Sequence, residues 1–147
     1  MAHYKSLHFT IEELVSPKVF NAYKDSQHKL WQLFDPNLLD VLDRLQEKFG
    51  TTYVNTWKWG GIYTLRGLRH MVIDLAELKR EKILLPVGPH EFGRAIDCHF
   101  KTIPARVVRE YILSHKSEYP EITGIETNVN WLHFDTRNSP TLQLFPG

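Results

Sequence analysis

The sequence GPHEFGRAID, residues 88–97, places a histidine seven positions before an aspartate. Residues 93–100 are predicted to form a β-strand, in which successive side chains point to opposite faces. Asp97 lies within this strand and His90 on the approach to it, while Gly93 lets the backbone turn tightly and approach its neighbours. The stretch therefore predicts a strand that carries a histidine and an aspartate close together at its beginning.

A second histidine follows 36 residues after Asp97, in the sequence WLHFD that begins at Trp131. This segment is also predicted to be a strand, with His133 on the same face as Trp131 and Asp135. If the two strands are neighbours in a sheet, two imidazoles and one carboxylate converge. Three protein ligands leave a fourth position for water at a catalytic zinc ion, which lowers the pKa of that water to about 7. The pattern therefore predicts a Zn²⁺ site made by His90, Asp97 and His133.

These two motifs resemble the metal-binding signature of the zinc D-Ala-D-Ala carboxypeptidases and related peptidoglycan peptidases. The family pattern is Ser-x-His-x-x-Gly-x-Ala-x-Asp, followed later by a histidine on a strand. The resemblance runs over most of the chain, and the late motif and the opening are similar to those of a small single-domain branch common in phage genomes. The residues that carry it are His90, Gly93, Ala95 and Asp97, the segment 131–137, and Phe9, Thr10, Glu13 and Leu14 near the start.

The resemblance implies a fold, a cofactor and an activity. The implied fold is the Hedgehog/DD-peptidase fold, and the implied cofactor is Zn²⁺ held by His90, Asp97 and His133. The implied activity is hydrolysis of peptide bonds in peptidoglycan stem peptides, by a carboxypeptidase or an endopeptidase. The expected partner is therefore a peptidoglycan peptide.

Two positions depart from the family pattern. Gly88 stands where the pattern has serine, which removes a hydrogen bond available to the metal ligands. Asn130 stands three residues before the last ligand, where several branches carry Glu or Asp, and an amide cannot take up a proton. Two other carboxylates are candidates for the catalytic base. Asp135 shares the strand face of the last ligand, and Glu126 would be paired with Trp131 by a four-residue hairpin turn.

The missing acid leaves a second function open. The protein could keep the fold and the metal but have lost catalysis, and then bind cell-wall peptide or another protein. A third, weaker alternative is a structural protein without metal. Zinc content cannot separate the first two functions, whereas an assay of fragments released from peptidoglycan can.

An arginine upstream of the first histidine is implied by the resemblance, in contact with the substrate carbonyl or carboxylate. Arg66 and Arg69 are the candidates, because guanidinium groups bind carboxylates through two parallel hydrogen bonds. Three aromatic residues precede them, Trp57, Trp59 and Tyr63. These either line a peptide-binding groove or pack in the core, and two adjacent glycines imply a loop between them.

The hydrophobic pattern predicts a single α+β domain over residues 1–147, with N-terminal helices packed on a mostly antiparallel sheet. The clearest helix is capped by Asp35, starts with Pro36 and ends at Gly50. The segment after Arg137 is predicted to be irregular. The other predicted elements are a helix from Thr10 with a capping box to Glu13, a helix in part of 71–85, a helix from Pro104 that ends before Pro120, and strands at 51–57, 93–100, 122–126 and 131–135.

The composition is that of an ordinary globular protein, with 42% hydrophobic and 24% charged residues among 147. A net charge of +1 with scattered basic residues implies no nucleic-acid partner. The single cysteine, Cys98, excludes an internal disulfide and a cysteine-rich zinc cluster. The sequence suggests neither a membrane span nor a secretory signal peptide. With the resemblance to the phage branch, this leads us to expect synthesis in the cytoplasm and action on the cell wall after release or as a virion component.

Overall fold

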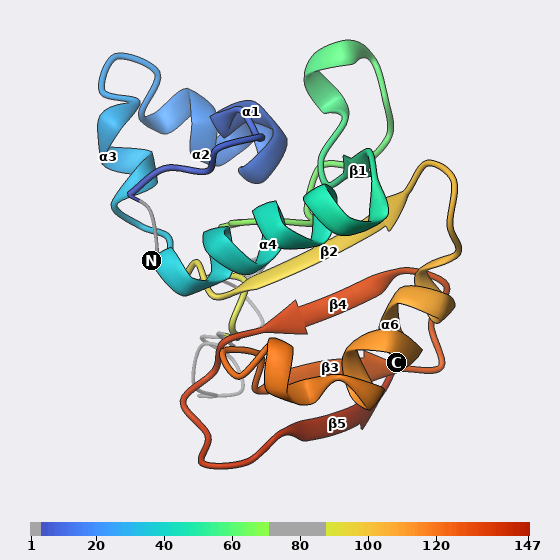
Figure 1. Ribbon diagram of the computed structural model, residues 1–147. Coiled ribbons are helices and arrows are strands. Elements are labelled where there is room, and N and C mark those ends of the chain that lie inside the picture. Colours follow the sequence, from blue (N-terminus) through green and yellow to red (C-terminus); the bar gives the residue numbers. More distant parts are fainter. Residues whose placement is uncertain (1–3, 71–87) are drawn as a thin grey trace, which may run out of the picture.

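The computed structural model describes residues 4–70 and 88–147 (Figure 1). It has an α+β architecture in which five strands form one sheet. The helical segments are α1 (Ile11–Leu14), α2 (Pro17–Ala22), α3 (His28–Trp31), α4 (Pro36–Phe49), the 3₁₀ turn η1 (Trp57–Trp59), α6 (Ala105–Ser114) and the 3₁₀ turn η2 (Lys116–Glu118). The strands are β1 (Thr52–Tyr53), β2 (Ala95–Phe100), β3 (Gly124–Thr127), β4 (Leu132–Asp135) and β5 (Gln143–Pro146).

The sheet has the strand order β1-β2-β4-β3-β5. Every pair is antiparallel except β3 with β5, so the prediction of a mostly antiparallel sheet is confirmed. The pairing of β2 with β4 sets Asp97 directly opposite His133. The two strands that carry the predicted metal ligands are therefore neighbours, as the sequence required.

Helices α4 and α6 cover one face of the sheet, and the main core lies between them and β2, β3 and β4 (Figure 1). Helix α4 follows its prediction: the Asp35 carboxylate accepts the Asn37 N–H at 3.1 Å, and Gly50 ends the helix with a φ of 89°. Asp97 and His133 alternate with the core residues of their strands and therefore lie on the opposite face. The fully buried residues of this core include Leu38, Leu39, Val41, Leu42, Leu45, Ile96, Cys98, Val108, Ile112, Ile125, Leu132 and Phe134.

Short helical turns build the N-terminal part of the chain. The Glu13 carboxylate accepts the Thr10 N–H at 2.7 Å, as the predicted capping box requires. Helix α1 ends before Ser16, whose hydroxyl then caps α2 by accepting the Val19 N–H at 3.3 Å. Across residues 4–70 and 88–147, no helix combines the length and the apolar character needed to cross a bilayer.

The predicted strand at 51–57 was too long, since only Thr52 and Tyr53 pair with β2. Asn55 gives the physical reason, because its buried side chain bonds to the backbone of two other segments where a strand would pair with its neighbour. Its amide donates to the Val15 carbonyl at 3.0 Å, and its side-chain oxygen accepts the Arg66 N–H at 2.9 Å. The chain therefore leaves the sheet here and runs toward the segment that follows residue 60.

The segment after Arg137 was wrongly predicted to be irregular, because it contains β5. This edge strand pairs in parallel with β3, with Gly124 opposite Gln143. Pro146 ends it at the sheet edge, where a missing N–H costs no ladder hydrogen bond. The helix predicted from Pro104 ends at Ser114, before Pro120 as predicted, and a 3₁₀ turn follows. The helix predicted within residues 71–85 lies outside the described residues.

Gly93 joins the N-terminal part of the chain to the start of β2. Its φ is 68°, and a Cβ there would lie 1.9 Å from the Leu33 carbonyl oxygen. Its own carbonyl accepts the Asp35 N–H at 2.9 Å. Only glycine satisfies both the backbone angle and this close approach.

We predict that Gly93→Ala lowers the free energy of unfolding by about 3 kcal/mol, because it adds a clash to a strained backbone. Gly50→Ala is the matched control, since Gly50 also has a positive φ but no atom within 4 Å of a Cβ. We expect Gly50→Ala to lower the free energy of unfolding, measured by urea denaturation, by about 1–2 kcal/mol. Equal losses in the two variants would contradict the role of the Leu33 contact.

Candidate metal centre

His90, Asp97 and His133 converge, and their ligand atoms all lie within 4.8 Å of one another. His90 Nε2 lies 3.3 Å from Asp97 Oδ2, and His133 Nδ1 lies 2.8 Å from Asp97 Oδ1. His90 comes from the turn before β2, Asp97 from β2 and His133 from β4. Both imidazoles are buried, each with 5% of its surface exposed. The structure therefore brings together the three residues that the sequence predicted as ligands.

The backbone carbonyl of Gly67 orients His90. His90 Nδ1 lies 3.0 Å from that oxygen, so Nδ1–H donates and Nε2 is the ring nitrogen that faces Asp97. Gly67 itself packs against the Leu14 carbonyl oxygen, which a Cβ would approach to 2.0 Å. Leu68 anchors the same segment by donating its N–H to Leu14 at 2.8 Å.

Asp135 orients His133. Its Oδ2 lies 2.8 Å from His133 Nε2, the ring nitrogen that points away from Asp97. Arg137 holds the same carboxylate with two bonds, from Nε at 2.8 Å and from Nη2 at 2.6 Å. Gly124, opposite Asp135 on β3, leaves room for the carboxylate, because a Cβ there would lie 2.2 Å from Asp135 Oδ1.

These contacts bear on Asp135, one of the two sequence proposals for the catalytic base. Asp135 is fully buried and its oxygens are occupied by His133 and Arg137. It lies beyond the imidazole ring as seen from Asp97, so it does not face the point where the ligand atoms converge. Asp135 is therefore a positioning residue for His133.

The titratable groups of the centre shift one another's pKa values. Burial alone would lower the pKa of His133, but hydrogen bonds to Asp135 and Asp97 outweigh it and raise the pKa to about 9. Burial would raise the pKa of Asp97, yet hydrogen bonds from His133 and His90 hold it well below its usual range. Burial likewise opposes the Arg137 and His133 contacts that lower the pKa of Asp135 to about 2. A metal ion binding to His133 Nδ1 must therefore displace a proton.

The donor set fits a divalent transition-metal ion. Two imidazole nitrogens and one carboxylate oxygen are ligands that such ions use in proteins. In both histidines the other ring nitrogen is bonded to a buried acceptor, which fixes ring orientation and raises ligand basicity in metal sites. The three residues can therefore hold a metal ion.

A pocket of about 380 Å³ opens beside Asp97. Arg66 lies at this pocket with its guanidinium carbon 3.5 Å from the centre of the Tyr63 ring. Its Nη1 donates to His99 Nδ1 at 2.6 Å. Burial and the neighbouring Arg66 charge lower the pKa of His99, which favours the neutral, accepting imidazole. The residues that line the pocket are Ile62, Tyr63, Thr64, Leu65, Arg66, Arg69, Asp97 and Trp131.

The predicted aromatic residues divide between this pocket and other contacts. Tyr63 lines the pocket, whereas Trp57 and Trp59 are not among the described residues that line it. Trp57 donates its indole N–H to the Val15 carbonyl at 2.9 Å and packs on Phe20, so it supports the N-terminal helices. Trp59 is 61% exposed. Of the three aromatic residues, only Tyr63 is in place to contact a ligand beside Asp97.

Glu126 lies on the same face as His133, although the hairpin register differs from the prediction. Gly124 lies opposite Asp135 and Ile125 opposite Phe134, so Glu126 falls opposite His133 instead of Trp131. A shift of two residues keeps the side chain on the same face. The indole N–H of Trp131 donates to Glu126 Oε2 at 3.2 Å. Glu126 is therefore linked to the pocket through Trp131.

The sequence prediction missed two residues of the site, Phe145 and His99. The Phe145 ring packs edge-on against His133 with centroids 5.3 Å apart, and Arg137 stacks on it at 4.6 Å. Phe145 belongs to β5, whose parallel pairing leaves no local signal. His99 shares the strand face of Asp97, which was visible in the alternation, but its contact with Arg66 joins residues 33 positions apart.

Comparison of the chain with protein-family models, with curated proteins and with solved structures finds no match.

We predict that Asp135→Asn weakens zinc binding about 10- to 100-fold, because a less basic acceptor then orients His133. Gly124→Ala should act in the same direction, since its Cβ would displace the Asp135 carboxylate. Competition with a chromophoric chelator measures both, with the exposed Glu110→Gln as control. Wild-type zinc affinity in Asp135→Asn would contradict the positioning role.

Proposed function

We propose that the protein is a zinc-dependent peptidase that hydrolyses peptide bonds in peptidoglycan stem peptides. The observation that carries the proposal is the convergence of His90, Asp97 and His133 beside a pocket that contains Arg66. Two histidines and a carboxylate also suit iron(II), and the resemblance to the zinc D-Ala-D-Ala carboxypeptidases favours zinc. The antiparallel strands that carry the ligands are consistent with the Hedgehog/DD-peptidase fold, which we propose for this chain.

Glu126 is the proposed general base. When bound, a zinc ion supplies Lewis-acid chemistry that polarises the scissile carbonyl and activates water. Glu126 then accepts the proton of the attacking water and returns it to the leaving amine. Three observations support Glu126: it lies on the His133 face, Trp131 orients its carboxylate, and Asp135 is occupied by other partners.

Arg66 is the proposed substrate-binding cation. Within the described part of the chain, no carboxylate lies within 4.0 Å of its guanidinium, whereas Arg69 is paired with Glu91 at 3.4 Å. His99 and the Tyr63 ring fix the orientation of Arg66 beside the pocket. Its remaining N–H groups suit the carboxylate or carbonyl of a peptide.

A binding module with the same site is the second candidate. Asn130 favours it, because this residue stands where several branches of the proposed family carry an acid. Asn130 is exposed in the β3–β4 loop and cannot replace that acid in proton transfer. Such a protein would bind cell-wall peptide without cutting it. In either case we propose a phage-type protein that meets the cell wall after release or as part of a virion.

Release of soluble fragments from purified peptidoglycan tests the enzyme. We expect cleavage with zinc that stops on addition of a chelator. Glu126→Gln should keep one zinc per chain and lower kcat about 10²- to 10⁴-fold, since it removes the base. Glu110→Gln, a matched change on an exposed helix face, should leave kcat unchanged.

Two results would contradict different parts of this proposal, the first the peptidase activity and the second the role of Glu126. An absence of chelator-sensitive cleavage across several wall chemotypes, together with retained peptide binding, would support the binding module. Full activity of Glu126→Gln would show that Glu126 is not the base, without contradicting the peptidase activity.

We further predict that His99→Phe raises KM about five- to tenfold and changes kcat less than twofold, because ground-state and transition-state binding weaken together. Phenylalanine keeps the packing against Tyr53 and Tyr63, whose ring centres lie 5.1 and 5.3 Å from His99, but removes the acceptor for Arg66. Steady-state kinetics on a stem peptide measure this. His99→Gln, which retains an acceptor, should recover most of the loss. A fall in kcat with unchanged KM would contradict the positioning of Arg66 by His99.

A further inference from the structure

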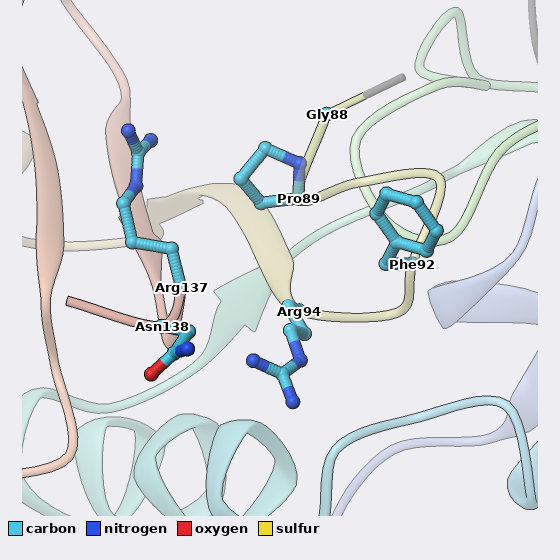
Figure 2. A pocket seen from close by; sticks show the side chains of 6 residues that line it. All are labelled: Gly88, Pro89, Phe92, Arg94, Arg137 and Asn138. Carbon is cyan, nitrogen blue, oxygen red and sulfur yellow. The ribbon is translucent and has the colours of Figure 1, made fainter.

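A second pocket, of about 450 Å³, is lined by six described residues that include none of the three metal ligands. It is larger than the pocket beside Asp97. Two of its lining residues are linked to the metal centre, one through the sequence and one through a contact. Pro89 precedes His90, and Arg137 holds the carboxylate that orients His133. Figure 2 shows Arg137 and Asn138 on the left, Phe92 on the right, and Arg94 below and between them.

Arg94 gives the pocket a positive charge without an acidic partner. Among the described residues, no carboxylate lies within 4.0 Å of its guanidinium. Within the described structure, the Arg94 guanidinium donates one hydrogen bond, a long one from Nη1 to the Thr136 carbonyl at 3.4 Å. The other guanidinium, on Arg137, is neutralised by Asp135 at 2.6 Å. The pocket therefore has one charge available for an anion.

The rest of the lining suits a peptide more than an inorganic anion. Phe92 is 62% exposed, and Pro89 adds a second apolar surface. The Asn138 amide offers both a donor and an acceptor, which matches the two groups of a peptide backbone. A carboxylate on a short peptide would meet the guanidinium while its neighbouring atoms cover the apolar side chains.

The two pockets are lined by residues that lie on either side of His133 in the sequence. Trp131, two residues before His133, lines the pocket beside Asp97, and Arg137, four residues after it, lines the pocket of Figure 2. Arg137 follows the end of β4, and its guanidinium binds the Asp135 carboxylate that contacts His133 Nε2, so this pocket adjoins the metal centre.

We propose that this second pocket is a subsite for a free carboxylate of a peptide substrate, with Arg94 as the anion-binding group. The proposal rests on the proposed peptidase function. Specificity at this subsite discriminates between acidic and amidated stem peptides.

Equilibrium binding tests the subsite without requiring turnover. The protein is the zinc-loaded Glu126→Gln variant, and the two probes are stem tetrapeptides that differ only in a free or amidated glutamate α-carboxyl group. Titration calorimetry should show the free acid binding about five- to tenfold more tightly, as expected for a partly exposed charge-assisted hydrogen bond. Adding Arg94→Gln should abolish this preference, because it weakens binding of the free-acid probe and leaves binding of the amidated probe unchanged. Adding Arg106→Gln, an exposed arginine on α6, should leave it unchanged.

Equal binding of the two probes, or a preference that survives Arg94→Gln, would overturn the subsite. N-acetylglutamate alone is the third probe, and binding as tight as that of the peptide would indicate a site for small anions instead. Failure of the peptidase proposal is seen separately, as the absence of cleavage of either tetrapeptide by the wild-type protein. The acid preference can hold or fail independently of that result.

Discussion

The antiparallel register between β2 and β4 is the constraint on which the rest of the site depends. It sets Asp97 opposite His133, and both side chains then share the face that α4 and α6 leave uncovered. A slip of one residue would turn either side chain into the apolar core and bring a core residue out. The hydrophobic contacts of Ile96 and Phe134 therefore stabilise the register and, through it, the metal ligands.

Contacts outside the ligand set orient these residues. Gly67 supplies the acceptor for His90, and Asp135 supplies the acceptor for His133, so each imidazole presents one nitrogen toward Asp97. Each acceptor needs a close approach that a larger side chain would block: Gly67 lies against Leu14, and Gly124 makes room for Asp135. The metal centre thus depends on two glycines and a buried carboxylate as much as on its ligands.

Local patterns in the sequence were sufficient to predict which three residues converge as candidate ligands, and to predict several elements. The alternation in β2 and β4 put His133 and Asp97 on strand faces, and the cap and stop residues of α4 marked its ends. Long-range contacts could not be read in the same way. The shortness of β1 depends on bonds from Asn55 to Val15 and Arg66, and the role of Asp135 depends on Arg137. A carboxylate two residues from a ligand fits a base or an orienting partner equally well until those contacts are known.

X-ray absorption at the zinc edge of the loaded, full-length protein tests the central claim most directly. One zinc per chain, bound by two imidazoles and by oxygen ligands, is the predicted result, and His133→Ala should remove one imidazole from the coordination shell. A sulfur ligand from Cys98, a shell of oxygen alone, or an unchanged shell in His133→Ala would contradict a metal centre made by His90, Asp97 and His133.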